Sequence, residues 1–357
     1  MKFTNRKGKN KAKNERKSKK EKFVKQKTPK KLRTKRRKAN KKSNHSLNRK
    51  GRYTTLSENK EHKFNSYEEI EEFLVNLLQM NSSNLQIIVI GESQEGKPIY
   101  LVSIANTDEI TEAIFIEAGS NGEDCVAVQC ALHIIKYLVE TASTCNYLKT
   151  MRYYIVPCSN PDAFEINKLG QKPCFNLSTN FPLRLGNLNI DNIDLQKFLE
   201  AARNWKESYQ FKSPEQMALL KALATFQYSI KIFISLQEEG FKITYPYGTC
   251  KEPIPEVEDI RRIALLSRSA NTLCFQVGSI YQLFGLRFGT VIDFITMFFN
   301  SIKFCYIFHI NSKNCSCNTQ EISERAMELL QCLALMGQEV SELCKKQSSD
   351  DNIVEFI

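Results

Sequence analysis

Histidine is scarce in this chain, although it is the residue that most often binds metals in proteins. Only four histidines occur among 357 residues, at positions 45, 62, 133 and 309. The first two lie in or beside a lysine-rich N-terminal stretch, and His133 lies between Leu132 and Ile134 in an apolar run typical of a packed helix. We therefore do not expect a metal centre built mainly from imidazole ligands.

Paired cysteines and long apolar runs are also lacking. The twelve cysteines include no Cys-x-x-Cys pair, and the nearest two, Cys315 and Cys317, lack the second ligand pair that a zinc knuckle needs. No secretory segment opens the sequence, and no run approaches the ~20 apolar residues of a membrane helix. We therefore expect reduced thiols, no membrane span and an intracellular protein, whereas secretion would require a different N-terminus.

Acidic residues are almost absent from the first 52 positions. This stretch carries 25 Lys or Arg and two acidic residues, a net charge of +23, whereas the other 305 residues carry 26 and 37, a net charge of −11. We expect residues 1–60 to form a disordered polybasic arm. Its clusters indicate a nuclear or nucleolar location, or a cytoplasmic one, and make residues 2–52 a candidate site for nucleic acid or another polyanion.

The arm has two open interpretations. A row of aromatic side chains for stacking bases is absent, so any binding of nucleic acid by the arm would be non-specific and sensitive to salt. The alternative is an arm that only increases solubility.

The remainder of the chain alternates between strand and helix patterns. Near-continuous apolar strands separated by amphipathic helices predict one α/β domain over residues 65–347, with a C-terminal tail at 348–357. Its sheet should be twisted, mixed but mostly parallel, and covered by helices on both faces. The expected strands are 85–90, 98–104, 113–117, 153–157, 230–236 and 304–310, and the expected helices start near 66, 124, 214, 256 and 319.

The stretch from Ala113 to Leu138 carries the main candidate site. It predicts a buried strand, a turn that contains Gly119 and Gly122, and a helix from about Asp124. Such a turn presents side chains at the carboxyl edge of an α/β sheet, where ligands bind. Asn121 and Asp124 are three residues apart there, so both can face one site.

This stretch resembles the zinc-binding segment of the metallocarboxypeptidases of the A/B type, in which Asp-Ala-Gly is followed by one residue, His, two residues and Glu. Glu117-Ala118-Gly119 keeps that frame, but Asn121 stands at the His position and Asp124 at the Glu position. Further motifs are similar to the family's over residues 65–345, namely Ser66–Ile70, Ile90–Tyr100, Ser159–Glu165, Asn176–Phe181, Phe211–Glu215 and Tyr245–Gly248. The resemblance implies a carboxypeptidase-like α/β fold.

The resemblance places the family's three zinc ligands, which are His, Glu and His in chain order, at Asn121, Asp124 and Gln237. Amide oxygens are weak zinc ligands, so one carboxylate and two amides should not hold zinc. The family's general base aligns with His309, which has no metal-bound water to deprotonate. We therefore expect neither bound zinc nor another cofactor.

The substrate positions of the family are also changed. Its Asn-Arg pair, which clamps the terminal carboxylate, becomes Ser178-Thr179, and a bidentate cation is lost. Ile292 occupies the position that sets side-chain preference. The family's mobile Tyr falls at Gly285, with Tyr281 and Phe284 nearby, and its other anion-stabilising Arg has no counterpart beyond Lys168 and Lys172.

These replacements predict a catalytically inactive carboxypeptidase-like protein that acts as a binding or scaffold module for an unknown protein or peptide. One alternative is residual or altered hydrolysis of C-terminal residues, with His309 as base, Asp124 as a lone carboxylate, or Cys125 as a nucleophile at a helix start. Another is a nucleic-acid-associated protein that binds through its arm.

Overall fold

A computed structural model describes residues 63–80, 84–142, 146–171, 175–182, 213–269, 272, 274–311 and 317–354. The chain divides into two units, residues 1–58 and 59–357, and all described residues belong to the second. The expected polybasic arm at 1–60 therefore lies outside the described residues. None of the described helices is long and apolar enough to cross a membrane.

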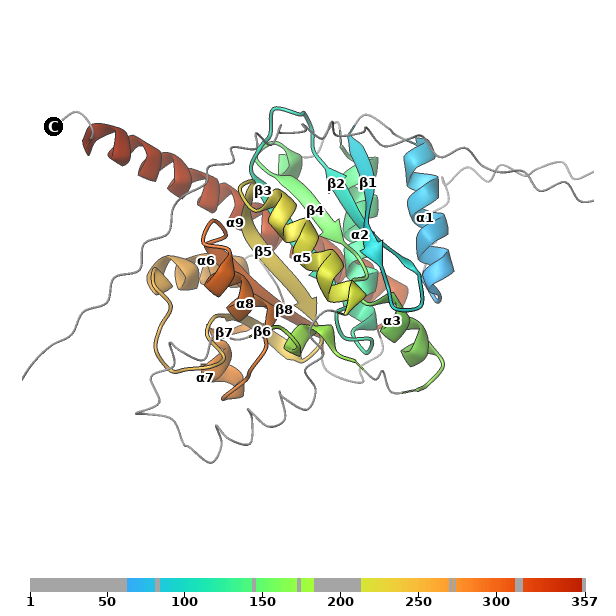
Figure 1. The fold of residues 1–357 in the computed structure, drawn as a ribbon. Coiled ribbons are helices and arrows are strands. Elements are labelled where there is room, and N and C mark those ends of the chain that lie inside the picture. Colours follow the sequence, from blue (N-terminus) through green and yellow to red (C-terminus); the bar gives the residue numbers. More distant parts are fainter. Residues whose placement is uncertain are drawn as a thin grey trace, which may run out of the picture. The chain divides into compact units, whose positions relative to one another are not determined.

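An eight-stranded sheet organises the described part of the chain, in the order β1-β2-β4-β3-β5-β8-β6-β7 (Figure 1). The central strands β4, β3, β5 and β8 are parallel to one another, whereas β1 pairs with β2, β2 with β4 and β6 with β8 in antiparallel fashion. The predicted mixed and mostly parallel sheet is confirmed. The strands are β1 Leu85–Glu92, β2 Pro98–Ile104, β3 Ala113–Ala118, β4 Arg152–Val156, β5 Ile230–Gln237, β6 Gly240–Tyr245, β7 Gln276–Ser279 and β8 Phe304–Asn311.

The central strands are apolar because both of their faces are covered. All six residues of β3 are buried, as expected for a strand in the middle of a parallel sheet. Alternate side chains of β3 enter two separate apolar clusters, with Ile114 and Ile116 on one face and Phe115 on the other. Such two-sided burial explains why the strand shows no alternation of apolar and polar residues.

Helices cover each face of the sheet. The face that contains Ile114 packs against α1 Tyr67–Met80, α2 Cys125–Glu140, α6 Val257–Ser269 and α9 Thr319–Val354. The opposite face packs against α5 Pro214–Phe226 and α8 Val291–Phe298, and α5 crosses this side of the sheet in Figure 1. Shorter elements are α3 Pro161–Lys168, α7 Ile280–Phe284 and the 3₁₀ turns Asn146–Leu148 and Leu177–Thr179.

The helix ends follow local sequence signals, with one difference. Ser66 Oγ accepts a hydrogen bond from Glu69 N at the start of α1, as the capping motif predicts. Helix α9 continues to Val354, so the expected tail at 348–357 begins inside this helix. Residues 345–354 contain neither Gly nor Pro, but residues 348–352 are Ser, Asp and Asn, residue types that are common in turns and tails.

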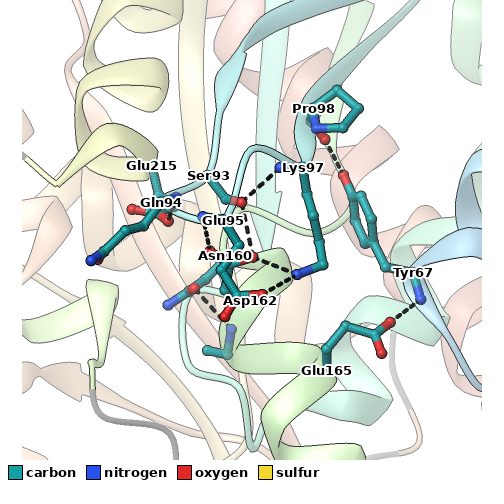
Figure 2. Close-up of polar contacts among 11 residues, drawn as sticks. Tyr67, Ser93, Gln94, Glu95, Lys97, Pro98, Asn160, Asp162, Glu165 and Glu215 are labelled. Atoms are coloured by element: carbon teal, nitrogen blue, oxygen red, sulfur yellow. Dashed lines mark hydrogen bonds and ion pairs between the residues drawn. The ribbon is translucent and has the colours of Figure 1, made fainter.

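A polar network fastens the β1–β2 turn to α3, and we call it the hairpin network (Figure 2). Asp162 accepts hydrogen bonds from Ser93 Oγ, Glu95 N and Lys97 Nζ, at 2.9, 2.9 and 2.8 Å. Lys97 Nζ also lies 2.8 Å from Glu95 Oε2. Because these donors come from residues 65–69 positions away from Asp162, the network fixes how the hairpin meets the rest of the domain.

Candidate functional site

The turn between β3 and α2 is shaped by close packing. Gly119 has a φ of +73°, and a Cβ at Gly122 would lie 2.3 Å from the carbonyl oxygen of Ala163 in α3. Both positions therefore require glycine. The turn places the half-buried Asn121 and the buried Asp124 beyond the carboxyl end of β3, as the sequence predicts.

Asp124 is joined to the end of β5 by its carboxylate. Asp124 Oδ1 accepts a hydrogen bond of 3.1 Å from the backbone N–H of Glu238. In return, the Glu238 carboxylate accepts from the backbone N–H groups of Val126 and Ala127, in the first turn of α2. Glu238 therefore caps α2 from a distant segment, and its negative charge lies at the helix N-terminus, where it is favoured.

Gln237 belongs to a separate series of hydrogen bonds that leads to the buried Glu117. Its Nε2 donates to Ser235 Oγ at 3.0 Å, and Ser235 Oγ donates to Glu117 Oε2 at 2.8 Å. Ser159 Oγ donates to the other oxygen of Glu117 at 2.5 Å. Burial raises the pKa of the Glu117 carboxyl above its usual value, and the donating hydroxyls oppose that rise.

His309 lies beside Gln237 in the sheet, since the two are register partners on β5 and β8. Its side chain is buried, with 1% of the residue exposed. His309 Nε2 is 3.4 Å from Thr244 Oγ1, and the ring of Phe284 meets the imidazole edge-on with centroids 4.9 Å apart. A general base must reach the proton it removes, and in this position the imidazole faces protein groups.

The former substrate positions lie in two places. The backbone N–H of Leu177 donates to Ser120 O at 2.9 Å, so the Ser178-Thr179 turn is tied to the loop that carries Asn121. The hydroxyl of Ser178 is used locally, because it donates to Asn176 Oδ1 at 2.7 Å. Ile292 is fully buried in the apolar cluster beneath α8. The structure therefore groups the clamp positions with Asn121 but places Ile292 in the core.

Cys125 at the start of α2 was a candidate nucleophile. Asn167 Nδ2 donates to its sulfur at 3.3 Å. Burial raises the pKa of the Cys125 thiol, although the nearby Lys168 opposes the rise. A raised pKa disfavours the thiolate, which is the nucleophilic form. Lys172 and Cys315 lie outside the described residues, and Cys317 is buried beside Arg325 Nη1.

The three ligand positions do not fit a zinc ion. Asp124, the one anionic side chain among them, already accepts from Glu238 N, and the amide of Gln237 donates to Ser235. Three protein ligands to zinc would require three electron-pair donors that face one point. Within the described ranges, no group of three or more His, Cys, Asp or Glu side chains is arranged to hold a metal ion.

The structure also identifies residues that the sequence analysis did not single out. Arg287 pairs with Glu239 in bidentate fashion, with both N–O distances at 2.7 Å. Lys242 Nζ lies 4.5 Å from the centroid of the Phe284 ring, and the Arg287 guanidinium lies 4.1 Å from it. The only signal in the sequence was the pair Glu238-Glu239 directly after a buried strand.

Known proteins with a similar sequence are carboxypeptidases. The chain is 26% identical over 267 residues to human carboxypeptidase A1, a match that covers 69% of this chain and 62% of that protein. Over 198 residues it is 26% identical to mouse carboxypeptidase M, covering 52% and 41% of the two chains. The chain thus spans less than two thirds of the length of these relatives.

Solved structures show the same fold. Bovine thrombin-activatable fibrinolysis inhibitor, in complex with tick carboxypeptidase inhibitor, aligns with a TM-score of 0.68 at 19% identity and covers 79% of this chain and 98% of that chain. Carboxypeptidase A from Helicoverpa armigera aligns with a TM-score of 0.65 at 17% identity, covering 78% and 74%.

The family model described as zinc carboxypeptidase matches residues 70–315, which include every former ligand position and His309. The chain belongs to the zinc carboxypeptidase family.

Proposed function

We propose that this protein is a carboxypeptidase-fold binding or scaffold module without peptidase catalysis. The observation that carries the proposal is the state of the three ligand positions. Asn121 and Gln237 are amides, and the carboxylate of Asp124 accepts from the backbone of Glu238. Without a Lewis acid at these positions, neither a scissile carbonyl nor a water molecule would be activated.

The position of the general base supports the same proposal. His309 is buried against Phe284 and Thr244, so its imidazole is poorly placed to accept a proton from water near a substrate. The pair Ser178-Thr179 offers no cation for a terminal carboxylate. The metal ligands, the general base and the carboxylate clamp of the family are thus all replaced in this chain, whereas the packing of the fold is intact.

Metal analysis of the purified protein tests the proposal. After incubation with zinc and dialysis, we expect well below one zinc per chain by inductively coupled plasma mass spectrometry. We also expect no release of amino acids from peptides with varied C-termini, with or without added zinc. Stoichiometric zinc together with chelator-sensitive release would overturn the proposal.

A ligand-restoring variant sharpens this test. Asn121→His, Asp124→Glu and Gln237→His together recreate the family's ligand set, and the triple variant should retain about one zinc. The matched control is Asn121→Gln with Gln237→Asn, which alters the same positions without adding imidazole and should stay metal-free. If the triple variant fails to bind zinc, side-chain replacement alone does not explain the metal-free state.

We also propose that the polybasic arm binds polyanions and directs the protein to the nucleus or nucleolus. The charge of +23 within residues 1–52 supports this role. Retention of the full chain on RNA or DNA should fall steeply as salt rises, because each neutralised phosphate releases a counterion. Removal of residues 2–52 should abolish retention and nuclear accumulation, and unchanged retention would exclude the proposal.

A further inference from the structure

We infer that the outer edge of β1, together with the exposed side of α1, binds a basic and extended segment of a partner protein as a further strand of the sheet. Strand β1 is one end of the sheet, and no described strand pairs with its outer side. Strands β2 and β4 separate it from β3, which leads to the former ligand position at Asn121. The inference therefore concerns a second surface and does not rest on the loss of catalysis.

Strand β1 has few of the features that protect an edge strand from pairing with another chain. Lysine, proline, bulges and short length are the usual protection. Residues 85–91 contain neither a charged residue nor proline, and Leu85–Val89 pair regularly with β2 before a bulge between Val89 and Gly91. The other edge of the described sheet, β7, has only four residues and is followed directly by α7. Of these two edges, β1 is therefore the one that can accept a further strand.

Helices on both faces of the sheet hold β1 in place. On one face α5 packs closely, since a Cβ at Gly91 would lie 2.5 Å from the Cβ of Ala218. On the other face Ile87 packs against the apolar cluster that includes Leu74 of α1. A strand that is already fixed loses little conformational freedom when a partner binds to it. The edge of β1 is thus ordered before any partner arrives.

Exposed apolar side chains lie beside this edge. Val89 is 55% exposed, and Val75 and Leu78 of α1 are 52% and 41% exposed. Val89 is the register partner of Tyr100, whose hydroxyl donates to Glu71 Oε1 at 2.9 Å. Positions 71, 75 and 78 follow one side of a helix, so the two exposed residues of α1 continue from this contact along β1. Helix α1 contacts β1 at this end of the sheet (Figure 1).

The charge of this surface indicates the chemistry of the partner. Helix α1 contains four acidic residues and β1 contains one, and neither element contains Lys, Arg or His. Glu68, Glu72 and Glu92 are exposed. Complementary charge favours association, whereas like charges oppose it. Two copies of this chain would bring two acidic surfaces together, so the charge favours a partner segment in which Lys or Arg alternates with apolar β-branched residues.

Peptide binding to the full chain tests the inference. The probes are fluorescein-labelled peptides with the eight-residue length of β1, in which Lys alternates with Val, Ile or Thr, and binding is followed by fluorescence anisotropy. At least one of them should bind roughly tenfold more tightly than the same peptide with Glu in place of Lys. N-methylation of the central residues keeps charge and side chains but removes backbone donors, and it should weaken binding roughly tenfold.

Variants of the chain locate the binding surface. Val89→Lys places a charge beside the strand edge and should weaken binding of the Lys peptide roughly tenfold. The matched control is Leu265→Lys on α6, where the side chain is 39% exposed, and it should leave binding unchanged. Glu68→Lys together with Glu72→Lys should reverse the preference between the Lys and Glu peptides. Circular dichroism checks that each variant is folded.

Hydrogen exchange of the wild-type protein gives a readout of the binding mode. A bound peptide should slow exchange of backbone N–H groups in Leu85–Glu92, because some of them would donate to the added strand. Exchange in α6 should not change.

Failure of every Lys peptide to bind, or equal binding of the N-methylated forms, would overturn the inference. A wild-type dimer that Val89→Lys dissociates, as measured by sedimentation velocity, would overturn the basic partner and assign this edge to a second copy of the chain. None of these results depends on zinc content or on peptide hydrolysis. The binding edge and the proposed loss of catalysis are therefore tested separately.

Discussion

Two polar regions of this domain differ in the groups that donate hydrogen bonds to their carboxylates. In the hairpin network, one carboxylate, Asp162, faces a hydroxyl, an N–H and an ammonium from another part of the chain. At the former ligand positions, the carboxylates of Asp124 and Glu238 face backbone N–H groups. In both regions the carboxylates accept from donors that are distant in the sequence, and at the ligand positions those donors include backbone N–H groups. We expect both sets of contacts to contribute to the stability of the fold.

The largest loss of stability should follow from the hairpin network. Asp162→Ala would leave three donors without their carboxylate, one of them the Lys97 ammonium, and should lower the free energy of unfolding by about 3 kcal/mol. Urea denaturation measures this change. Glu95→Ala is the control, because the Glu95 side chain is 62% exposed and its removal should cost less than ~1 kcal/mol. Equal losses would show that the network is not centred on Asp162.

The turn between β3 and α2 should not accept a side chain at Gly122, because the backbone of α3 packs closely against it. Gly122→Ala places a methyl group against the backbone of Ala163 and should destabilise the protein by about 2 kcal/mol. Gly96→Ser offers a contrast, since Gly96 has a φ of +81° but no atom within 4 Å of its added Cβ. Its cost should be only that of the left-handed backbone, about 1 kcal/mol. Thermal melting of the two variants would reveal whether contact or conformation dominates.

Asp293 should make the free energy of unfolding depend on pH. This carboxyl accepts from Gly248 N, and burial raises its pKa to about 7. In the unfolded chain it releases its proton near pH 4, whereas the folded protein retains it to about pH 7. Its ionisation should therefore lower stability progressively as pH rises across this window.

Asp293→Asn should remove that decline, as the difference between urea midpoints of variant and wild type from pH 4 to 8 would show. Asp108→Asn controls for the loss of one charge, since the Asp108 side chain is fully exposed. A decline of equal size in Asp293→Asn and wild type would assign the pH dependence to other groups.

The smallest loss of stability should follow from removal of the Glu238 side chain, which caps α2. Glu238→Ala removes the acceptor for Val126 N and Ala127 N and should cost about 1 to 2 kcal/mol. Glu238→Gln keeps one acceptor oxygen and should cost less. If Glu238→Ala instead stabilises the protein, Glu238 is held in place for a ligand rather than for the fold, and the comparison between the two regions fails.

Much of the fold could be predicted because its signals are local. The mostly apolar runs in Pro98–Ile104 and Ala113–Ala118 predict strands at the observed positions, and the turn between β3 and α2 follows from its glycines. Strand β7 has only four residues, including Gly278, and carries too little pattern to be recognised. The full length of α9 could not be predicted because residues 348–352 are Ser, Asp and Asn, which favour a turn or tail over a helix.

The site could be located from the sequence, but its internal contacts could not. The turn that carries Asn121 and Asp124 and the end of β5 at Gln237 follow from the resemblance to the family. The capping role of Glu238 depends on the pairing of β3 with β5, which brings together residues more than 110 positions apart. The pair of Glu239 and Arg287 likewise joins residues 48 positions apart. Such contacts exist only once the sheet has formed.

The pairing of β5 with β8 has a consequence for protein engineering. The backbone pairing of β5 with β8 sets Gln237 beside His309, so the relative position of the two residues follows from the sheet register. A designer could therefore vary the side chains at these two strand ends while the sheet keeps their relative position. Catalytic or binding side chains introduced at these positions would be held in a defined relative position by a fold that already exists.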